Sequence, residues 1–471
     1  MARTVDLLII GAGSAGLNAA KEARRWTSDF LLVDPGPWGT TCARVGCMPS
    51  KVLLHVAHEV ATTRATLAGP HAAGHLDAVD TKAVMARVRE LRDRFAAGPK
   101  ATVERYGEHV IAAPARFTAP DTVVAGGEPI RARRIIVATG SHPVVPGPWR
   151  ELGDALVTSD EVFELDTLPG RVGVVGLGAI GSELGQALAR LGVDVHVFAK
   201  DRRVGTLADP VANAAATAAL SREMALHTGH AVDPARLDTG GVAVGFGEQR
   251  YEVDKLLVAM GRAPNVAGLN LDALGLRLDR AGLPPIDPAT LRAGDTPVHF
   301  AGDVTMRHPL LHEAADDGRL AAYAALAPDP ACLRRRTPLA IVFTDPGIAR
   351  VGCAHDALPD DALVSEIDYS RQGRGIVTGV THGVARLYAT RHGDLLGAEL
   401  VVPQAEHLAH QLAWMIQMGG TVTEMLQLPF YHPVLEEGLR TALQDVRRRA
   451  GRAAGPDLPL CGGTDDPVPG C

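Results

Sequence analysis

The chain has 471 residues, of which 46% are hydrophobic and 21% charged, and its 47 basic and 54 acidic residues give a net charge of −7. This length and composition predict several globular domains and exclude a disordered or fibrous protein. The acidic balance argues against a general nucleic-acid partner or an anionic membrane surface. No apolar run reaches the roughly 18 residues of a membrane-spanning helix, and the strand-like residues 5–10 follow the N-terminus without a leader pattern. We therefore expect a cytoplasmic protein with no nucleic-acid and no membrane partner.

The first motif is an apolar strand, a glycine turn and a helix. Residues 5–16 read Val-Asp-Leu-Leu-Ile-Ile-Gly-Ala-Gly-Ser-Ala-Gly, a helix is predicted over Leu17–Trp26, and a second strand over Phe30–Val33 ends on Asp34. Glycines at this spacing let the backbone approach a pyrophosphate, whose charge then faces the helix N-terminus. The predicted nucleotide contacts in this turn are Gly11, Gly13, Ser14 and Gly16.

The same pattern returns in the middle of the chain. Residues 171–181 read Arg-Val-Gly-Val-Val-Gly-Leu-Gly-Ala-Ile-Gly and precede a helix predicted over Ser182–Leu191 and a strand predicted over Val193–Phe198. A single fingerprint is weak evidence, but two copies, each placed between a strand and a helix, predict two dinucleotide-binding domains in an α/β chain. The predicted contacts in the second turn are Gly176, Gly178, Ile180 and Gly181.

The remaining segments complete a domain plan. Thr81–Arg105 has the pattern of a long amphipathic helix, and strands are predicted over 110–125 and Arg133–Val137. After residue 336 the chain mixes short strands with helices, which is an α+β pattern without a glycine fingerprint; the strands are predicted at 340–343, 385–389 and 396–401, and the helices at 404–418 and 433–448. The predicted domains are 1–148 with 265–334, then 149–264, then 335–450, followed by a mobile tail over 451–471.

Residues 39–51, which read Gly-Thr-Thr-Cys-Ala-Arg-Val-Gly-Cys-Met-Pro-Ser-Lys, carry the chemistry. Cys42 and Cys47 lie five positions apart and can close a small disulfide loop. Pro49 suits the first turn of a helix over residues 50–57 and beyond. Cys47 then lies near a helix N-terminus, which favours the thiolate. A zinc site needs further ligands nearby, and this segment offers none, so we predict no metal site.

Together these motifs resemble the pyridine nucleotide–disulfide oxidoreductase family, whose members include dihydrolipoamide dehydrogenase, glutathione reductase and mercuric reductase. The resemblance covers about residues 4–448 and includes further motifs in the family's order, namely Ala138-Thr-Gly-Ser141, Met260-Gly-Arg-Ala-Pro-Asn265, Ala301-Gly-Asp303, and His432-Pro433 with Glu437. It implies an α/β fold with two Rossmann-like domains, one for FAD and one for NAD(P), and a C-terminal α+β dimerisation domain.

The resemblance implies that the first fingerprint holds FAD. Asp34 stands where the family usually has Glu and is expected to accept hydrogen bonds from the adenosine ribose, and Asp303 is expected to bond the ribityl chain. A helix over 311–325 is expected to direct its N-terminal N–H groups at the pyrimidine end of the flavin. The further cofactor contacts that the motifs imply are Thr41, Lys51, Thr139, Gly140, Gly261, Arg262 and Gly302.

A comparison of the two repeats favours NADPH over NADH. The position in the second repeat that matches Asp34 is Ala199, so the acid that binds a ribose 2′-hydroxyl and repels a 2′-phosphate is missing. Lys200, Arg202 and Arg203 follow directly, and such cations suit a 2′-phosphate. The alternative is a solvated basic turn.

The resemblance also implies the catalytic roles. Lys51 pairs with Glu183 beside the flavin, and electrons pass from NADPH through FAD to Cys47. Cys42 attacks the substrate as the interchange thiol and Cys47 then resolves the mixed disulfide. His432 acts as acid and base, with Glu437 orienting its ring.

In the family this histidine reaches the disulfide of the other subunit, which implies a homodimer with a shared active site. An aromatic gate of some members is replaced here by Ala179.

The predicted substrate is a small-molecule disulfide or dithiol. The alternatives are an NAD-linked dihydrolipoamide dehydrogenase, a mercuric-type metal-ion reductase and, from another class, a redox-silent flavin-binding partner protein. In the tail, Cys461 and Cys471 are interpreted either as inert or as a thiol pair that relays electrons outward.

Overall fold

The computed structural model describes residues 3–70, 72–380, 382–451 and 457–458. These residues form two compact units. The first unit contains the described residues of 1–176, 187–198 and 231–335, and the second contains those of 177–186, 199–230 and 336–471. The predicted domain boundaries stay a prediction, and Cys461 and Cys471 lie outside the described residues.

The first unit is built on a seven-stranded sheet with the order β3-β2-β1-β6-β5-β4, and β17 pairs with β6. Strands β1, β2, β3, β6 and β17 run parallel, whereas β4 and β5 extend the sheet antiparallel from β6. The bounds are β1 Arg3–Ile10, β2 Phe30–Val33, β3 Val110–Ile111, β4 Ala115–Ala119, β5 Thr122–Ala125, β6 Glu128–Val137 and β17 Val298–Phe300.

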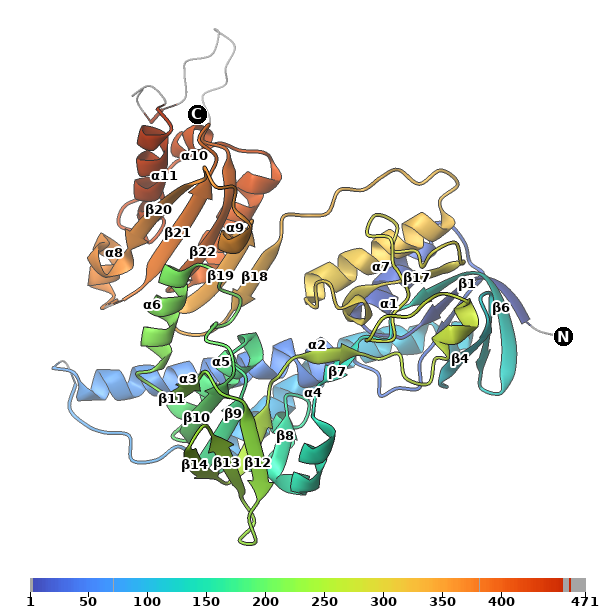
Figure 1. The fold of residues 1–471 in the computed structure, drawn as a ribbon, viewed down its shortest axis with the longest axis horizontal. Helices are drawn as coiled ribbons and strands as arrows, with labels where there is room; N and C mark the ends of the chain where they lie inside the picture. Colours follow the sequence, from blue (N-terminus) through green and yellow to red (C-terminus); the bar gives the residue numbers. More distant parts are fainter. Residues whose placement is uncertain (1–2, 71, 381, 452–456, 459–471) are drawn as a thin grey trace. The chain divides into compact units, whose positions relative to one another are not determined.

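Side chains of β1 alternate between two cores, as a buried strand requires. One core lies against α1 (Ser14–Ala23) and α7 (Leu311–Leu326) and includes Leu7 and Ile9. The other core includes Leu8 and Ile10 and lies against β4, β5 and residues 269–283. In Figure 1, α1 and α7 lie side by side over the strands of this sheet.

The first unit also contains a second parallel arrangement. Strand β9 (Arg171–Val175) lies between β10 (Asp194–Ala199) and β15 (Lys255–Val258), and β15 pairs in turn with β8 (Leu156–Thr158). Helix α5 (Ala179–Arg190) follows β9, and its residues up to Gln186 belong to the second unit. Smaller antiparallel sheets are formed by β12 (Val232–Arg236), β13 (Val242–Phe246) and β14 (Gln249–Val253), and by β7 (Ser141–Pro143) and β16 (Arg262–Pro264).

Three helices connect the strands of the first unit before β3. Their bounds are α2 Thr41–Val45, α3 Cys47–Ala68 and α4 Thr81–Arg105. Asp80 caps α4, accepting a hydrogen bond from the backbone N–H of Ala83 at 3.0 Å. This cap fixes the start of α4 at the residue that the sequence predicted.

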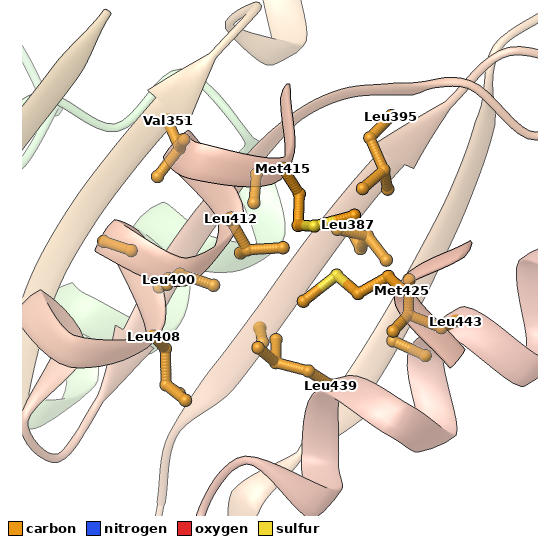
Figure 2. Close-up of a cluster of buried hydrophobic side chains, with 14 of the residues drawn as sticks. Val351, Leu387, Leu395, Leu400, Leu408, Leu412, Met415, Met425, Leu439 and Leu443 are labelled. Carbon is orange, nitrogen blue, oxygen red and sulfur yellow. The ribbon is translucent and has the colours of Figure 1, made fainter. Parts of the chain in front are cut away.

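The second unit contains an antiparallel sheet with the order β18-β19-β22-β21-β20. One face is covered by α9, α10 and α11, and Figure 2 shows their leucines and methionines packed against Val351, Leu387 and Leu400. The bounds are α6 Pro210–Leu220, β11 Ala225–Thr228, β18 Leu339–Val342, β19 Gly347–Gly352, β20 Leu363–Asp368, α8 Gly373–Val377, β21 Val384–Ala389, β22 Leu395–Val402, α9 Ala405–Gln417, α10 Val422–Leu426 and α11 Glu437–Arg449.

Within the described part of the chain, every helix is too short or too polar to cross a lipid bilayer.

The contact between α1 and α7 yields a stability prediction. A Cβ added to Gly318 of α7 would lie 2.1 Å from the backbone oxygen of Ala15 in α1, so the two helices would have to separate. We expect Gly318→Ala to destabilise the protein by about 1–3 kcal/mol, because overpacking outweighs the better helix propensity of alanine. The measurement is the midpoint of urea denaturation followed by circular dichroism.

Gly98→Ala in α4 is the matched control, since a Cβ there meets nothing within 4 Å. It should leave the protein as stable or stabilise it by up to about 1 kcal/mol. Equal midpoints for the two variants would contradict the close packing of α1 on α7.

Candidate active site

The first glycine turn passes close to the end of β6. Gly11 has φ +109°, and a Cβ there would lie 2.3 Å from the backbone oxygen of Ala138. Only glycine allows this conformation and this approach. Helix α1 begins at Ser14, and no side chain caps its first turn, while a Cβ at Gly13 would meet nothing within 4 Å. The first N–H groups of α1 are therefore placed as in a site for a phosphate group.

Asp34 lies at the carboxyl end of β2, beside the glycine turn. Its Oδ2 accepts a hydrogen bond from the backbone N–H of Ala12 at 2.6 Å, and its Oδ1 accepts one from Gly36 at 2.7 Å. These bonds fix the carboxylate, and each oxygen keeps acceptor capacity for a hydroxyl group. The predicted ribose contact is thus held next to the turn that would bind the phosphates.

Polar groups gather where β6 ends. The hydroxyl of Thr139 is buried without a hydrogen-bond partner, which is costly unless a ligand supplies one. The Ser141 hydroxyl donates to Asp303 at 3.3 Å, and burial raises the pKa of the Asp303 carboxyl against the opposing charge of Arg262. The unpaired hydroxyl of Thr139, the carboxyl of Asp303 and the turn at Gly11 fit an adenine dinucleotide such as FAD, the cofactor that the family resemblance implies.

Arg262 has a role that the sequence did not indicate. Its Nε donates to the Ser141 hydroxyl at 2.8 Å and a second nitrogen donates to the Ser141 backbone oxygen at 2.8 Å. Asn265 donates to the backbone oxygen of Thr139 at 2.9 Å. These two side chains brace the turn after β6, and a direct contact of Arg262 with a cofactor stays a prediction.

The two cysteines lie on consecutive short turns. Cys42 is in α2, Gly46 separates the helices, and Cys47 is the first residue of α3. A Cβ on Gly46 would lie 3.1 Å from the backbone oxygen of Thr41 and 3.2 Å from the Cα of Cys42. Glycine therefore lets the start of α3 fold closely against α2, with Pro49 in the first turn, where no N–H is needed.

Both cysteines are present as thiols, and their side chains are hydrogen-bonded to each other. The pKa of the Cys42 thiol is raised well above its ordinary value, first by this hydrogen bond with Cys47 and then by burial. The charge of Lys51, one turn further along α3, acts in the opposite direction. The two thiols also differ in environment, since Cys42 is half-buried in α2 whereas Cys47 is exposed at the start of α3.

Lys51 and Glu183 belong to different compact units, and their predicted pairing stays a prediction. Glu183 is buried, and its Oε1 accepts a hydrogen bond from the backbone N–H of Phe343 at 2.8 Å. This bond ties α5 to the segment after β18 within the second unit.

The second glycine turn repeats the first. Gly176 has φ +112°, and a Cβ there would lie 2.3 Å from the backbone oxygen of Ala259 at the end of β15. Ala199 is buried at the end of β10, whereas Lys200, Arg202 and Arg203 are all exposed. The predicted cations are thus accessible to an anionic group.

His432 contacts the acid that the sequence assigns to it. Its Nδ1 lies 2.9 Å from Oε1 of Glu437, and its side chain is 78% exposed. The hydrogen bond with His432, followed by that of the Val434 N–H, lowers the pKa of Glu437. An ionised carboxylate only accepts, so Nδ1 carries the hydrogen, and Nε2 of the neutral ring is left as a base.

The predicted site residues are divided between the two units. The first unit contains Gly11, Gly13, Ser14, Gly16, Asp34, Thr41, Cys42, Cys47, Lys51, Thr139, Gly140, Gly176, Gly261, Arg262, Gly302 and Asp303. The second unit contains Gly178, Ile180, Gly181, Glu183, Lys200, Arg202, Arg203, His432 and Glu437. Among the described residues, no group of three His, Cys, Asp or Glu side chains could hold a metal ion.

Comparison with known proteins gives consistent matches over nearly the whole chain. Residues 5–318 match the pyridine nucleotide-disulphide oxidoreductase family, and residues 339–443 match its dimerisation domain. A dihydrolipoyl dehydrogenase of Haloferax volcanii is 31% identical over 96% of this chain and 98% of its own. A mercuric reductase of Acidithiobacillus ferrooxidans is 34% identical over 94% of this chain and 83% of its own.

Solved structures agree on the fold. LpdA of Mycobacterium tuberculosis aligns with a TM-score of 0.82 at 27% identity and covers 94% of this chain and 100% of its own. The HOCl-induced flavoprotein disulfide reductase RclA of Escherichia coli, in its Cu(II) complex, aligns with a TM-score of 0.82 at 22% identity over 95% of this chain and 100% of its own.

The glycine turns, the cysteine pair and the two family matches agree, and the chain belongs to the pyridine nucleotide-disulphide oxidoreductases, a family of FAD-dependent enzymes that act on sulfur groups and use a pyridine nucleotide.

Proposed function

We propose that this enzyme uses NADPH to reduce a small-molecule disulfide through Cys42 and Cys47. The observation that carries the proposal is the contact between these two thiols at the start of α3, with the pKa of Cys42 raised by Cys47. Bound FAD supplies the chemistry that the side chains lack, since a flavin accepts a hydride from a nicotinamide and passes its two electrons to a neighbouring disulfide. The glycine turn after β1, Asp34, Thr139 and Asp303 are the residues that would hold it.

The different environments of the two thiols support the proposed sulfur roles. Cys47 is the first residue of α3, where the helix dipole favours a thiolate, whereas Cys42 keeps its proton until a base removes it. The Cys42 sulfur then attacks a substrate disulfide, forms a mixed disulfide and expels one substrate thiolate, which takes up a proton. Attack of Cys47 on Cys42 releases the second thiol and leaves the Cys42–Cys47 disulfide. The two electrons that the substrate gains are those that the dithiol loses.

His432 supports this exchange as the base for Cys42. Its Nδ1 is bound to Glu437, so the ring is oriented and Nε2 is the atom that would take the proton from Cys42 and return it to the leaving thiolate. The chain carries the family's dimerisation domain, and we propose a homodimer in which His432 of one copy acts on the cysteines of the other.

The nucleotide preference rests on charge. Ala199 replaces the acid that would repel a 2′-phosphate, and Lys200 and Arg202 are exposed in the loop that follows. The proposed location is the cytoplasm, where thiols are kept reduced and cysteine pairs that cycle are catalytic.

An anaerobic titration with NADPH, followed by a screen of disulfides for reoxidation of the reduced protein, tests the proposal as a whole. We expect a long-wavelength thiolate–flavin absorbance band that one class of disulfide discharges. Lipoamide with NAD⁺ and mercuric ion with NADPH belong in the same screen, because named relatives are dihydrolipoyl dehydrogenases and mercuric reductases. Faster turnover with either of these would replace the proposed substrate.

Cys42→Ser and Cys47→Ser should each reduce turnover with the disulfide substrate to below about 1%, because either change removes one partner of the exchange. NADPH oxidation by an artificial electron acceptor should persist in both variants. Cys353→Ser is the control, since this thiol is hydrogen-bonded to the backbone oxygen of Ala357 and should leave turnover unchanged. Full disulfide turnover in the cysteine variants would refute the sulfur route.

His432→Ala should lower kcat/KM for the disulfide by roughly 10²–10⁴-fold, the usual contribution of a positioned acid and base. Glu437→Gln should lower it less, because the amide oxygen still accepts from Nδ1 but carries no charge. The measurement is the pH profile of kcat/KM, with Glu436→Gln as the matched control at the neighbouring acid. Equal profiles for Glu437→Gln and Glu436→Gln would speak against an orienting role of Glu437.

Lys200→Gln and Arg202→Gln should each raise KM for NADPH by about tenfold, since each removes a charge-assisted hydrogen bond to phosphate. KM for NADH should remain as it is. Steady-state kinetics with both nucleotides measure this, and a higher kcat/KM for NADH in the unaltered protein would overturn the proposed preference.

A further inference from the structure

The loop that carries the predicted nucleotide cations is held by a buried acid from the dimerisation-domain sheet. Glu399 of β22 is fully buried, and its Oε2 accepts hydrogen bonds from the backbone N–H groups of Ala208 and Asp209 at 2.6 and 2.8 Å. Its Oε1 accepts one from the backbone N–H of His355 at 3.0 Å. One carboxylate therefore fixes both the end of the loop after β10 and the short turn at residues 355–357.

Asp209 strengthens this attachment. It is fully buried at the N-terminus of α6, where its Oδ1 accepts from the Val211 N–H at 2.8 Å. Its Oδ2 accepts from Nε of Arg386 at 2.9 Å and from the Tyr388 hydroxyl at 3.0 Å. Arg386 and Tyr388 lie on β21, on the opposite sheet face from the apolar core, and α6 lies beside this sheet in Figure 1. Detachment of the loop would leave the buried carboxylate of Glu399 and the guanidinium of Arg386 without their partners, so these contacts anchor it.

The start of the loop is fixed as well. Asn213 of α6 accepts from the backbone N–H of Val204 at 2.8 Å and donates to the backbone oxygen of Arg202 at 3.0 Å. The backbone around Arg203 is therefore held on both sides, and the position of its side chain depends on what the guanidinium contacts.

That contact is an acid. A nitrogen of Arg203 lies 3.2 Å from Oδ2 of Asp356, and both side chains are about half exposed, at 57% and 52%. Asp356 follows His355, the residue whose N–H is held by Glu399. The carboxylate of Asp356 is therefore held against the guanidinium of Arg203. A 2′-phosphate would bind the same guanidinium, because carboxylate and phosphate both accept hydrogen bonds from its N–H groups.

We propose that Asp356 is a specificity-determining residue for the pyridine nucleotide, because its carboxylate competes with the 2′-phosphate for Arg203. The inference rests on the proposed use of NADPH. A nucleotide with a 2′-phosphate must displace Asp356 to gain Arg203, whereas a nucleotide with a 2′-hydroxyl leaves the Arg203–Asp356 pair intact. Asp356 therefore lowers the preference for the phosphorylated nucleotide and leaves the binding of the other unaffected.

The test is Asp356→Asn in the full-length protein with its flavin, with Kd for NADP⁺ and NAD⁺ measured by calorimetry. We expect Kd for NADP⁺ to fall by about two- to fivefold, the size that an exposed ion pair allows, and Kd for NAD⁺ to stay constant. The gain should shrink in about 1 M salt, where the Debye length is near 3 Å.

Asp361→Asn is the matched control. Asp361 is a half-exposed acid that pairs with Arg391 at 2.8 Å, so its substitution changes the net charge equally and leaves Arg203 alone. It should not alter either Kd. A double-mutant cycle completes the design, because the effect of Asp356→Asn should vanish when Arg203 is already Gln.

The outcomes separate the inference from the proposed function. If Asp356→Asn leaves Kd for NADP⁺ unchanged, or changes it no more than Asp361→Asn does, the inference is wrong. In that case weaker NADP⁺ binding by Lys200→Gln or Arg202→Gln still supports the proposed use of NADPH. If all these variants bind NADP⁺ as the unaltered protein does, both the inference and the nucleotide preference are refuted.

Discussion

In the proposed reaction, the chemistry depends on the contact between the sulfur atoms of Cys42 and Cys47. The hydrogen bond with Cys47 raises the pKa of the Cys42 thiol, and burial raises it further. The contact exists because α2 stops at Val45, Gly46 admits a close approach, and α3 starts at Cys47. A Cβ at position 46 would lie 3.1 Å from the backbone oxygen of Thr41, so the turn between the two helices would have to shift.

Close approaches that only glycine allows also occur in the two glycine-rich turns of the first unit. Gly11 brings the turn after β1 against the end of β6, and Gly176 brings the turn after β9 against the end of β15. In α1 no side chain caps the first turn, so its backbone N–H groups are available to a pyrophosphate. The strands differ, but the steric reason is identical in the two repeats.

Local signals explain which parts the sequence could predict. The bounds of α4 were predicted correctly, because Asp80 caps its start and apolar residues such as Val84 and Val88 lie on one face of its first turns. Helix α1 was predicted at Leu17–Trp26 but begins at Ser14, since the last residues of the glycine turn are already helical. The final helix was predicted from Pro433 but α11 begins at Glu437, because residues 433–436 form the turn that brings Glu437 to His432.

The strands β12, β13 and β14 were missed; β12 has no buried residue and contains Pro234, which argues against a strand in the sequence. In the candidate site, local motifs indicate the cysteines, the glycines and the histidine. They do not indicate contacts between distant segments, such as Ser141 with Asp303 or Glu399 with the backbone of Ala208. No periodicity within a segment encodes these pairs, because they form only when the sheets assemble.

The sheet of β18–β22 in the second unit has an apolar face that packs on helices and a polar face that carries buried charges. On β21 and β22, side chains of one face pack on α9, α10 and α11, while Arg386 and Glu399 stand opposite each other on the other face. The apolar face stabilises the unit. On the polar face, the buried carboxylate of Glu399 accepts hydrogen bonds from backbone N–H groups of the loop after β10. Replacing Glu399 with an apolar residue would leave the backbone N–H groups of Ala208, Asp209 and His355 without their acceptor. The loop after β10 would then lose its fixed position. The contact between Arg203 and Asp356, on which the proposed choice between NADPH and NADH depends, would lose its geometry with it.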